Sequence, residues 1–146
     1  MTILLKICSL LICGNIYMSF DWKEFQEVGD NLKKTPCESY QRSAVGRYYY
    51  SCYTPVKEYF ETVIRVIGSD ENSHKAIIEG LCESNEDKEK ELGGALSNLR
   101  RYRNNADYHK SFKQSNVRKA QRTAKDIHKL LKKLINEKKK YGFFKF

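Results

Sequence analysis

The sequence contains only two prolines and eight glycines among its 146 residues. Both residue types supply the tight turns of β-rich folds and are abundant in disordered chains, so their scarcity argues against both classes. The sequence also has no apolar run of 18 residues, which excludes a conventional membrane-spanning helix. Apolar residues still make up 40% and charged residues 31%, which is enough to bury the core of one soluble domain.

Histidine is also scarce, with three copies, and the five cysteines form no Cys-x-x-Cys pair. Without a Cys/His cluster at zinc spacing, we expect no metal and no cofactor. An odd number of cysteines does not complete a disulfide framework. We therefore expect reduced thiols and a cytoplasmic protein.

Acidic residues are nearly missing from the last quarter of the chain. Residues 1–110 hold 15 Lys/Arg and 16 Asp/Glu, whereas residues 111–146 hold 12 Lys/Arg and only two acidic residues. The net charge of +9 therefore comes from this last segment. Such an uneven distribution favours a polyanionic partner, nucleic acid above all, although a solvated basic helix face would give the same pattern.

Apolar residues recur at helical spacing along almost the whole chain, and no segment alternates as a strand does. The sequence thus predicts an all-α, up-and-down bundle of four to five helices. We expect helices over about 21–32, 38–67, 74–82, 92–106 and 115–136, with residues 83–91 as a solvent loop. Asp21 and Ser115 are expected as N-caps, Asn72 or Ser73 as the cap of the short helix, and Gly68 as a C-cap.

These helices form one expected domain, residues 18–136, followed by a basic tail, residues 137–146. Residues 1–17 are hydrophobic and differ from the rest. Lys6 lies inside the apolar run rather than ahead of it, and no small-residue cleavage site follows, which argues against a signal peptide. We favour a misassigned start before Met18, because Met18 directly opens an amphipathic segment. An extra helix and a membrane anchor are the alternatives.

One segment near residue 105 combines residue types that can act on RNA. Arg103 and His109 are six residues apart, so an unbroken helix would place them on different faces. They can converge only if the helix bends before His109 or if a second subunit brings another copy alongside. Histidine can then transfer a proton, while arginine holds a phosphate and Asn104 assists. The competing interpretation is structural, with Asp107 as an ion-pair partner of Arg103 at i+4.

Three segments together resemble the HEPN superfamily of small helical domains. The first is the Arg-x5-His motif of Arg103 and His109, with a polar residue directly after the arginine. The second is SFDWKEFQEVGDNL at 19–32, and the third is RSAVGRYYY at 42–50. Residues 99–108 further match an L-R-x-x-R-N-x-A-D-Y pattern of one prokaryotic subgroup. The resemblance spans about residues 18–135.

The resemblance implies a homodimeric, metal-independent endoribonuclease, active as a toxin or defence effector. Arg103 would stabilise the phosphate, His109 would transfer the proton, and Asn104 would be the polar helper. RNA would be the substrate, a nucleotidyltransferase-type antitoxin a candidate partner, and no membrane partner is expected. Further candidate RNA contacts are Arg47, Arg100, Arg118 and Lys125.

Two alternatives to a nuclease remain open from the sequence. The first is a non-catalytic HEPN module that binds nucleotide, RNA or a nucleotidyltransferase. The second is a helical interaction protein that contacts membranes through residues 1–17. The cluster of Tyr48, Tyr49, Tyr50 and Tyr53 could stack on bases, but core packing is the favoured interpretation. His74 is expected to be structural.

Overall fold

The computed structural model describes residues 20–143, and within this range every regular element is a helix. The all-α helical bundle that the periodicity predicted is thereby confirmed. Five helices make up the described chain: α2 (Glu24–Lys34), α3 (Glu38–Val63), α4 (Ser73–Cys82), α5 (Asp87–Tyr108) and α6 (Ser115–Lys140).

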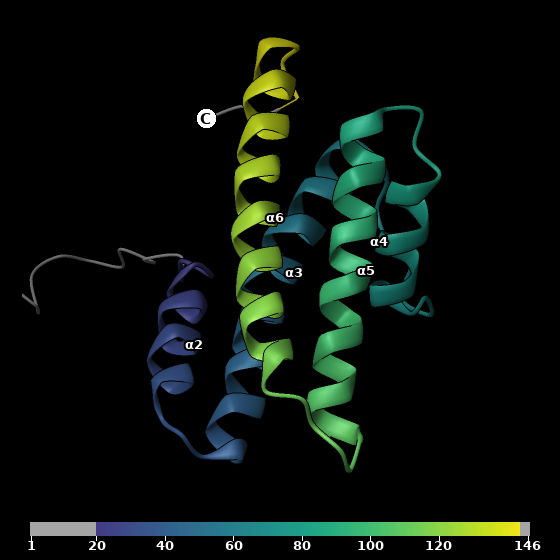
Figure 1. Ribbon diagram of the computed structural model, residues 1–146. Coiled ribbons are helices and arrows are strands. Elements are labelled where there is room, and N and C mark those ends of the chain that lie inside the picture. Colours follow the sequence, from purple (N-terminus) through teal and green to yellow (C-terminus); the bar gives the residue numbers. More distant parts are fainter. Residues whose placement is uncertain (1–19, 144–146) are drawn as a thin grey trace, which may run out of the picture.

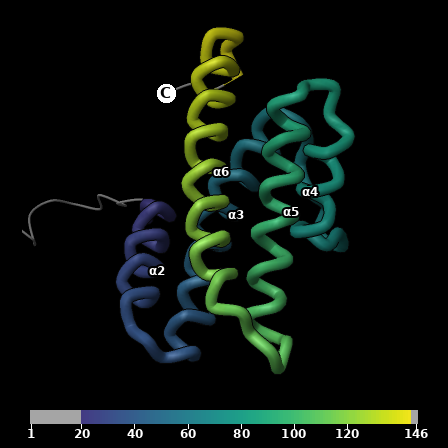
Figure 2. The backbone as a smooth tube through the Cα atoms, in the orientation of Figure 1, coloured from purple at the N-terminus to yellow at the C-terminus, as the bar shows by residue number. Residues whose placement is uncertain are grey.

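Helix α3 lies at the centre of the bundle and contacts each of the other four helices. The shorter α2 packs antiparallel to it on one side, and α4 packs against α5 on the other (Figure 1). The tube view shows α5 and α6 as an antiparallel pair in front of α3 (Figure 2). The chain segment that joins α5 to α6, which contains the candidate site, therefore lies at one end of the bundle.

The core is built from the apolar stripes that the sequence predicted. Every member of the α6 stripe is buried: Val117, Ala120, Ala124, Ile127, Leu131 and Leu134. Tyrosine contributes as well, because Tyr48, Tyr49 and Tyr59 are at most 1% exposed. Each of these hydroxyls has a polar partner, as buried hydroxyls require. The interpretation of the tyrosine cluster as core is thus confirmed for Tyr48, Tyr49 and Tyr53, which are all buried.

Among the described helices, only α4 has a side-chain N-cap hydrogen bond, and neither Asp21 nor Ser115 is the N-cap that the sequence predicted. The Asn72 side chain accepts a hydrogen bond from the backbone N–H of Lys75 and caps α4, and the Asp21 carboxylate accepts from the N–H of Lys23 just before α2. Ser115 differs from its expected role, because it is the first residue of α6 and its side chain makes no capping hydrogen bond.

Helix α3 ends at Val63, four residues earlier than predicted, so Gly68 is not its C-cap. The backbone N–H groups of Ile64 and Arg65 both bond to the carbonyl of Phe60 and close the last turn. Ile67 still packs against the core from the irregular segment that follows. Its place in the apolar stripe was therefore correct, although its helical conformation was not.

Helix α5 begins at Asp87, within the residues expected to form a solvent loop. The reason is Glu89, which is only 3% exposed and is held by partners from three elements. The Tyr59 hydroxyl donates to its Oε1 at 2.5 Å, the Ser84 hydroxyl donates to its Oε2, and the ammonium of Lys138 lies 3.4 Å away. This acidic segment is thus helical and partly buried because its charge is satisfied.

Helix α6 continues to Lys140, beyond the expected boundary at residue 136. Lys138 is half-buried and forms ion pairs with Glu86 and Glu89, so it belongs to the folded domain rather than to a basic tail. The hydrophobic segment 1–17 lies outside the described residues. Among residues 20–143, no helix is long and apolar enough to cross a membrane.

Candidate functional site

The end of α5 is fixed by an arginine from another helix. Nη1 of Arg42 donates to the carbonyl oxygens of Ala106 at 2.6 Å and His109 at 2.9 Å, and Nη2 donates to that of Lys110 at 3.1 Å. The last carbonyls of a helix have no intrahelical donor, and a cation there also opposes the negative end of the helix dipole. Arg42 therefore determines where α5 stops and how the chain turns.

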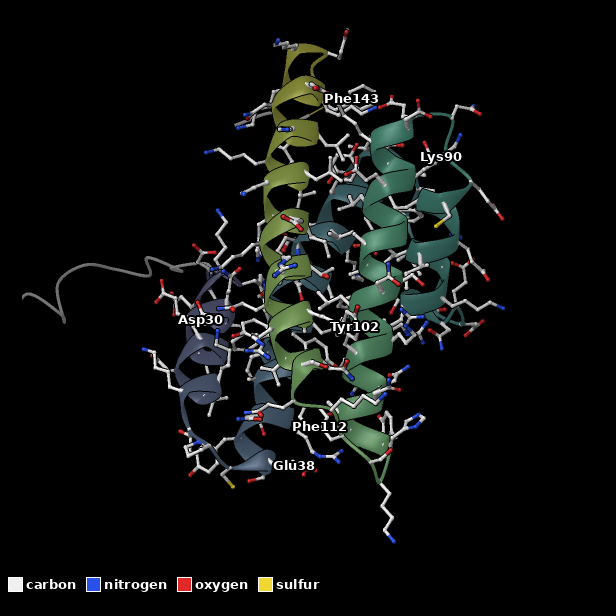
Figure 3. All side chains as sticks on the ribbon, in the orientation of Figure 1. Asp30, Glu38, Lys90, Tyr102, Phe112 and Phe143 are labelled. Carbon is white, nitrogen blue, oxygen red and sulfur yellow. The ribbon has the colours of Figure 1, made fainter. Side chains whose placement is uncertain are left out.

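Two further contacts hold the Arg42 guanidinium in place. Nε donates to Glu38 at 2.8 Å, and the group lies 4.8 Å from the ring centroid of Phe112. Figure 3 shows Glu38 and Phe112 at the same end of the bundle. The carbonyl partners of Arg42 cannot be predicted from the sequence around it, because they belong to residues more than 60 positions later.

His109 is the first residue after α5 and has an extended backbone, as the expected break before it requires. Its side chain is exposed and borders a hollow of about 400 Å³. The other lining residues are Arg101, Tyr102, Asn105, Ser111, Lys113, Asn116 and Lys119. Three of these are cationic, and the described lining contains no carboxylate, so the hollow favours an anion.

Arg103 has different neighbours. Its Nε lies 2.7 Å from Oδ2 of Asp107. The two groups form an ion pair, but the contact does not meet the geometry of a hydrogen bond. Its guanidinium lies 5.8 Å from the ring centroid of Tyr50 and 5.3 Å from that of Tyr108. One Nη contacts the side-chain oxygen of Asn104 at 3.4 Å. The structural interpretation of Arg103, pairing with Asp107, is thus observed.

The structure brings Asn104 to Arg103, but it gives Arg103 and His109 separate surroundings within one chain. Arg103 contacts helix α3 through Tyr50, whereas His109 borders the hollow on the side of α6. The end of α5 before His109 is one of the two conditions under which the pair could meet. Within one chain, the end of the helix alone does not bring the Arg103 and His109 side chains together.

The four further candidate RNA contacts are dispersed over the bundle. Arg47 is exposed on α3, with its guanidinium 4.8 Å from the ring centroid of Phe25. Arg118 and Lys125 are exposed on α6, and Arg118 borders a separate hollow of about 220 Å³. Arg100 is half-buried on α5, one turn before Arg103. These positions do not form one continuous site with His109.

Sequence reasoning took His74 as structural and missed that the charge of Arg103 acts on it. Nδ1 of His74 lies 2.6 Å from the Tyr49 hydroxyl, and the His74 ring stacks on Tyr53 with centroids 4.0 Å apart. Burial lowers the pKa of His74, and the positive charges of Arg100 and Arg103 lower it further. His74 thus shares the electrostatic environment of the two arginines, and only the packing of α4 onto α5 reveals this.

The third histidine belongs to an apolar groove on the other side of the bundle. His128 lies on α6, with Nε2 at 3.3 Å from the Ser51 hydroxyl, and its pKa is lowered mainly by burial. The groove of about 450 Å³ beside it is lined largely by side chains of α6 and by Pro55. Among the described residues, no three His, Cys, Asp or Glu side chains are grouped as metal ligands.

Comparison with known proteins gives no relative from which a role could be transferred. No family model matches the chain, and neither a curated protein nor a solved structure matches it significantly. A function for this chain therefore has to be inferred from its own residues and their contacts.

Proposed function

We propose that the chain binds RNA at the end of α5 and cleaves it without a metal ion, as its resemblance to the HEPN superfamily implies. The observation that supports this is the position of His109, exposed directly after α5 at the edge of a basic hollow. Imidazole exchanges protons near neutral pH. Arg101, Lys113 and Lys119 beside it can hold the phosphates of a strand.

The reaction that suits these groups is an internal transfer at a ribose–phosphate linkage. His109 accepts the proton of the 2′-hydroxyl, whose oxygen attacks the neighbouring phosphorus. The bond from phosphorus to the 5′-oxygen breaks, and that oxygen takes up the proton that the His109 imidazolium gives back. The products are a 2′,3′-cyclic phosphate and a free 5′-hydroxyl. Arg103 stabilises the charge that develops on the phosphate oxygens.

Because Arg103 and His109 have separate surroundings in one chain, this proposal requires a homodimer. In it, Arg103 of one copy approaches His109 of the other, and Asp107 releases or shares the guanidinium. A stable dimer in solution is therefore part of the proposal. Ultracentrifugation of the purified chain measures it, and a strictly monomeric protein that still cleaves RNA would contradict this arrangement.

Cleavage of RNA in the presence of EDTA tests the chemistry. We expect His109→Ala to slow cleavage by about a hundredfold or more, the usual contribution of a proton-transfer group. Arg103→Ala should slow it as well. His128→Ala is the matched control, because His128 lies in another part of the bundle and should leave the rate unchanged. Wild-type activity in His109→Ala, with folding confirmed by circular dichroism, would refute the proposed role.

A second candidate function is a non-catalytic module that binds RNA, nucleotide or a nucleotidyltransferase-type antitoxin. The pairing of Arg103 with Asp107 favours it, because a guanidinium already held by a carboxylate is less free for phosphate. This candidate predicts RNA binding that weakens steeply with salt, with no cleavage products. The same EDTA assay, run beside a binding titration, separates the two.

A further inference from the structure

The face where α3, α4 and α5 meet holds a histidine in a fixed position. Nδ1 of His74 is 2.6 Å from the Tyr49 hydroxyl, and its ring stacks on Tyr53 at 4.0 Å. The ring of Tyr50 meets it nearly edge-on, with centroids 6.5 Å apart. These contacts orient the imidazole through Nδ1 and through the stacked Tyr53 ring. Within residues 20–143 its other nitrogen, Nε2, has no hydrogen-bond partner.

Two arginines of α5 are near enough to this imidazole for their charges to act on it. The Arg103 guanidinium is 5.8 Å from the ring centroid of Tyr50, the same ring that borders His74. Arg100 precedes it by three residues and thus lies on the same face of α5. Both positive charges lower the pKa of His74, with burial as the larger cause. Burial raises the pKa of the Tyr49 hydroxyl, and the same two charges act to lower it.

The charge on this face is not balanced by the described chain. Arg103 has Asp107 as its ion-pair partner, but half-buried Arg100 has no carboxylate within ion-pairing distance among residues 20–143. Two guanidiniums one turn apart repel each other, and partial burial increases the cost. A bound anion would relieve this repulsion. The planar guanidinium fits phosphate oxygens with paired hydrogen bonds.

We propose that Arg100, Arg103 and Nε2 of His74 form a binding site for a phosphate group. The site shares Arg103 with the proposed function, but it lies on the face toward α3 and α4, and its occupation needs neither RNA cleavage nor His109. Arg101 borders the His109 hollow instead, since adjacent residues of a helix point about 100° apart. Inorganic phosphate, a nucleotide and an RNA strand all present the required group.

The ring protons of the three histidines, followed by NMR, test the site on the full chain. The probes are sodium phosphate, adenosine monophosphate and a short RNA, titrated at constant ionic strength, with His74 assigned by His74→Gln. We expect a saturable shift of the His74 signals and a rise in the pKa of its imidazole, because a bound anion stabilises the charged form. The signals of His128 should not move. Absence of a saturable His74 shift with all three probes would overturn the proposal.

A matched pair of arginine variants separates a built site from general attraction. Arg100→Gln should weaken phosphate binding by about tenfold or more, because it removes charge-assisted hydrogen bonds to the anion. Arg122→Gln removes the same charge from an exposed position on α6 that neither proposal uses, and it should change the dissociation constant by less than about twofold. Arg100→Lys, which keeps the charge, should retain part of the affinity. Equal loss in Arg100→Gln and Arg122→Gln would overturn the proposal.

The two proposals fail in distinguishable ways. If phosphate shifts His74 but RNA stays intact in EDTA, the phosphate site stands and the nuclease proposal falls. If instead the His74→Gln variant cleaves RNA at the wild-type rate, and no probe shifts the His74 signals of the unchanged chain, the nuclease stands and the phosphate site falls. Among the three probes, the one that binds most tightly identifies the source of the phosphate.

Discussion

Replacing half-buried Arg42 by alanine should destabilise the fold far more than the same change at exposed Arg47 of the same helix. The Arg42 side chain makes three hydrogen bonds to the terminal carbonyls of α5 and the following turn, and its guanidinium lies 4.8 Å from the Phe112 ring centroid. Alanine would leave those carbonyls to water. The region is partly exposed, so water recovers some of the loss.

The expected cost can be assembled from these contacts. Hydrogen bonds from a charged donor and the favourable position at a helix C-terminus together contribute about 2 kcal/mol after hydration is regained. The ring contact adds about 0.5 kcal/mol. The ion pair with Glu38, which is itself exposed, adds a few tenths of a kcal/mol at most. We therefore expect Arg42→Ala to lower the free energy of unfolding by about 3 kcal/mol and Tm by roughly 6–12 °C.

Urea unfolding followed by circular dichroism measures this change, and Arg47→Ala is the control. Arg47 contacts the ring of Phe25 at 4.8 Å and is otherwise exposed, so its loss should cost less than about 1 kcal/mol. Arg42→Lys keeps the charge, but one ammonium cannot reproduce the forked geometry, and an intermediate loss is expected. Equal effects of Arg42→Ala and Arg47→Ala would refute the reasoning.

Three other predictions concern the core and pH. Alanine at Gly93 would place its Cβ 2.9 Å from Leu81 Cβ and should destabilise by about 1–3 kcal/mol, whereas alanine at Gly94 meets nothing within 4 Å and should stabilise by up to about 1 kcal/mol in denaturant unfolding. Tyr59→Phe removes a donor to buried Glu89 and should cost about 1–3 kcal/mol in the same assay; an unchanged midpoint would contradict this. Burial and then Lys23 lower the pKa of His128 below 6.5, so the unfolded chain binds its proton more readily. The contribution of His128 to the free energy of unfolding is complete above about pH 6.5 and is lost as the pH falls toward the lower pKa of the folded state. His128→Gln should therefore flatten this part of the plot of unfolding free energy against pH.

The parts of the fold that the sequence predicts correctly are those set by local patterns. The α6 stripe has uninterrupted steps of three and four, and all six of its apolar residues are buried. The short helix α4 begins where Asn72 can cap it. In both cases the information lies within one or two turns of the chain, which is the range over which periodicity and capping act.

The errors occur where a distant partner decides the structure. The acidic start of α5 looked like a solvent loop because the partners of Glu89 lie on α3, on the preceding loop and on α6. Gly93 in the same helix is required because Leu81 approaches it too closely for a side chain. Neither fact can be read from the segment itself.

In the candidate site, too, the features set by local spacing were predictable and those set by distant residues were not. The Arg103–Asp107 pair follows from i,i+4 spacing, and the end of the helix before His109 was one of two stated conditions. The neighbours of Arg103 were not predictable, because Tyr50 and His74 reach it only through the packing of α3 and α4 on α5. The local pattern thus suggests candidate residues, whereas their grouping depends on tertiary contacts.

Arg42 connects the fold to the proposed chemistry, because one of its hydrogen bonds is to the backbone carbonyl of His109 itself. Arg42→Ala should therefore slow RNA cleavage although it removes no reacting group, since the imidazole would no longer be held at the edge of the hollow. The loss should persist at temperatures where the variant remains folded. Cleavage at the wild-type rate under those conditions would mean that the turn after α5 does not position His109 for the reaction, and the active imidazole would have to be sought elsewhere.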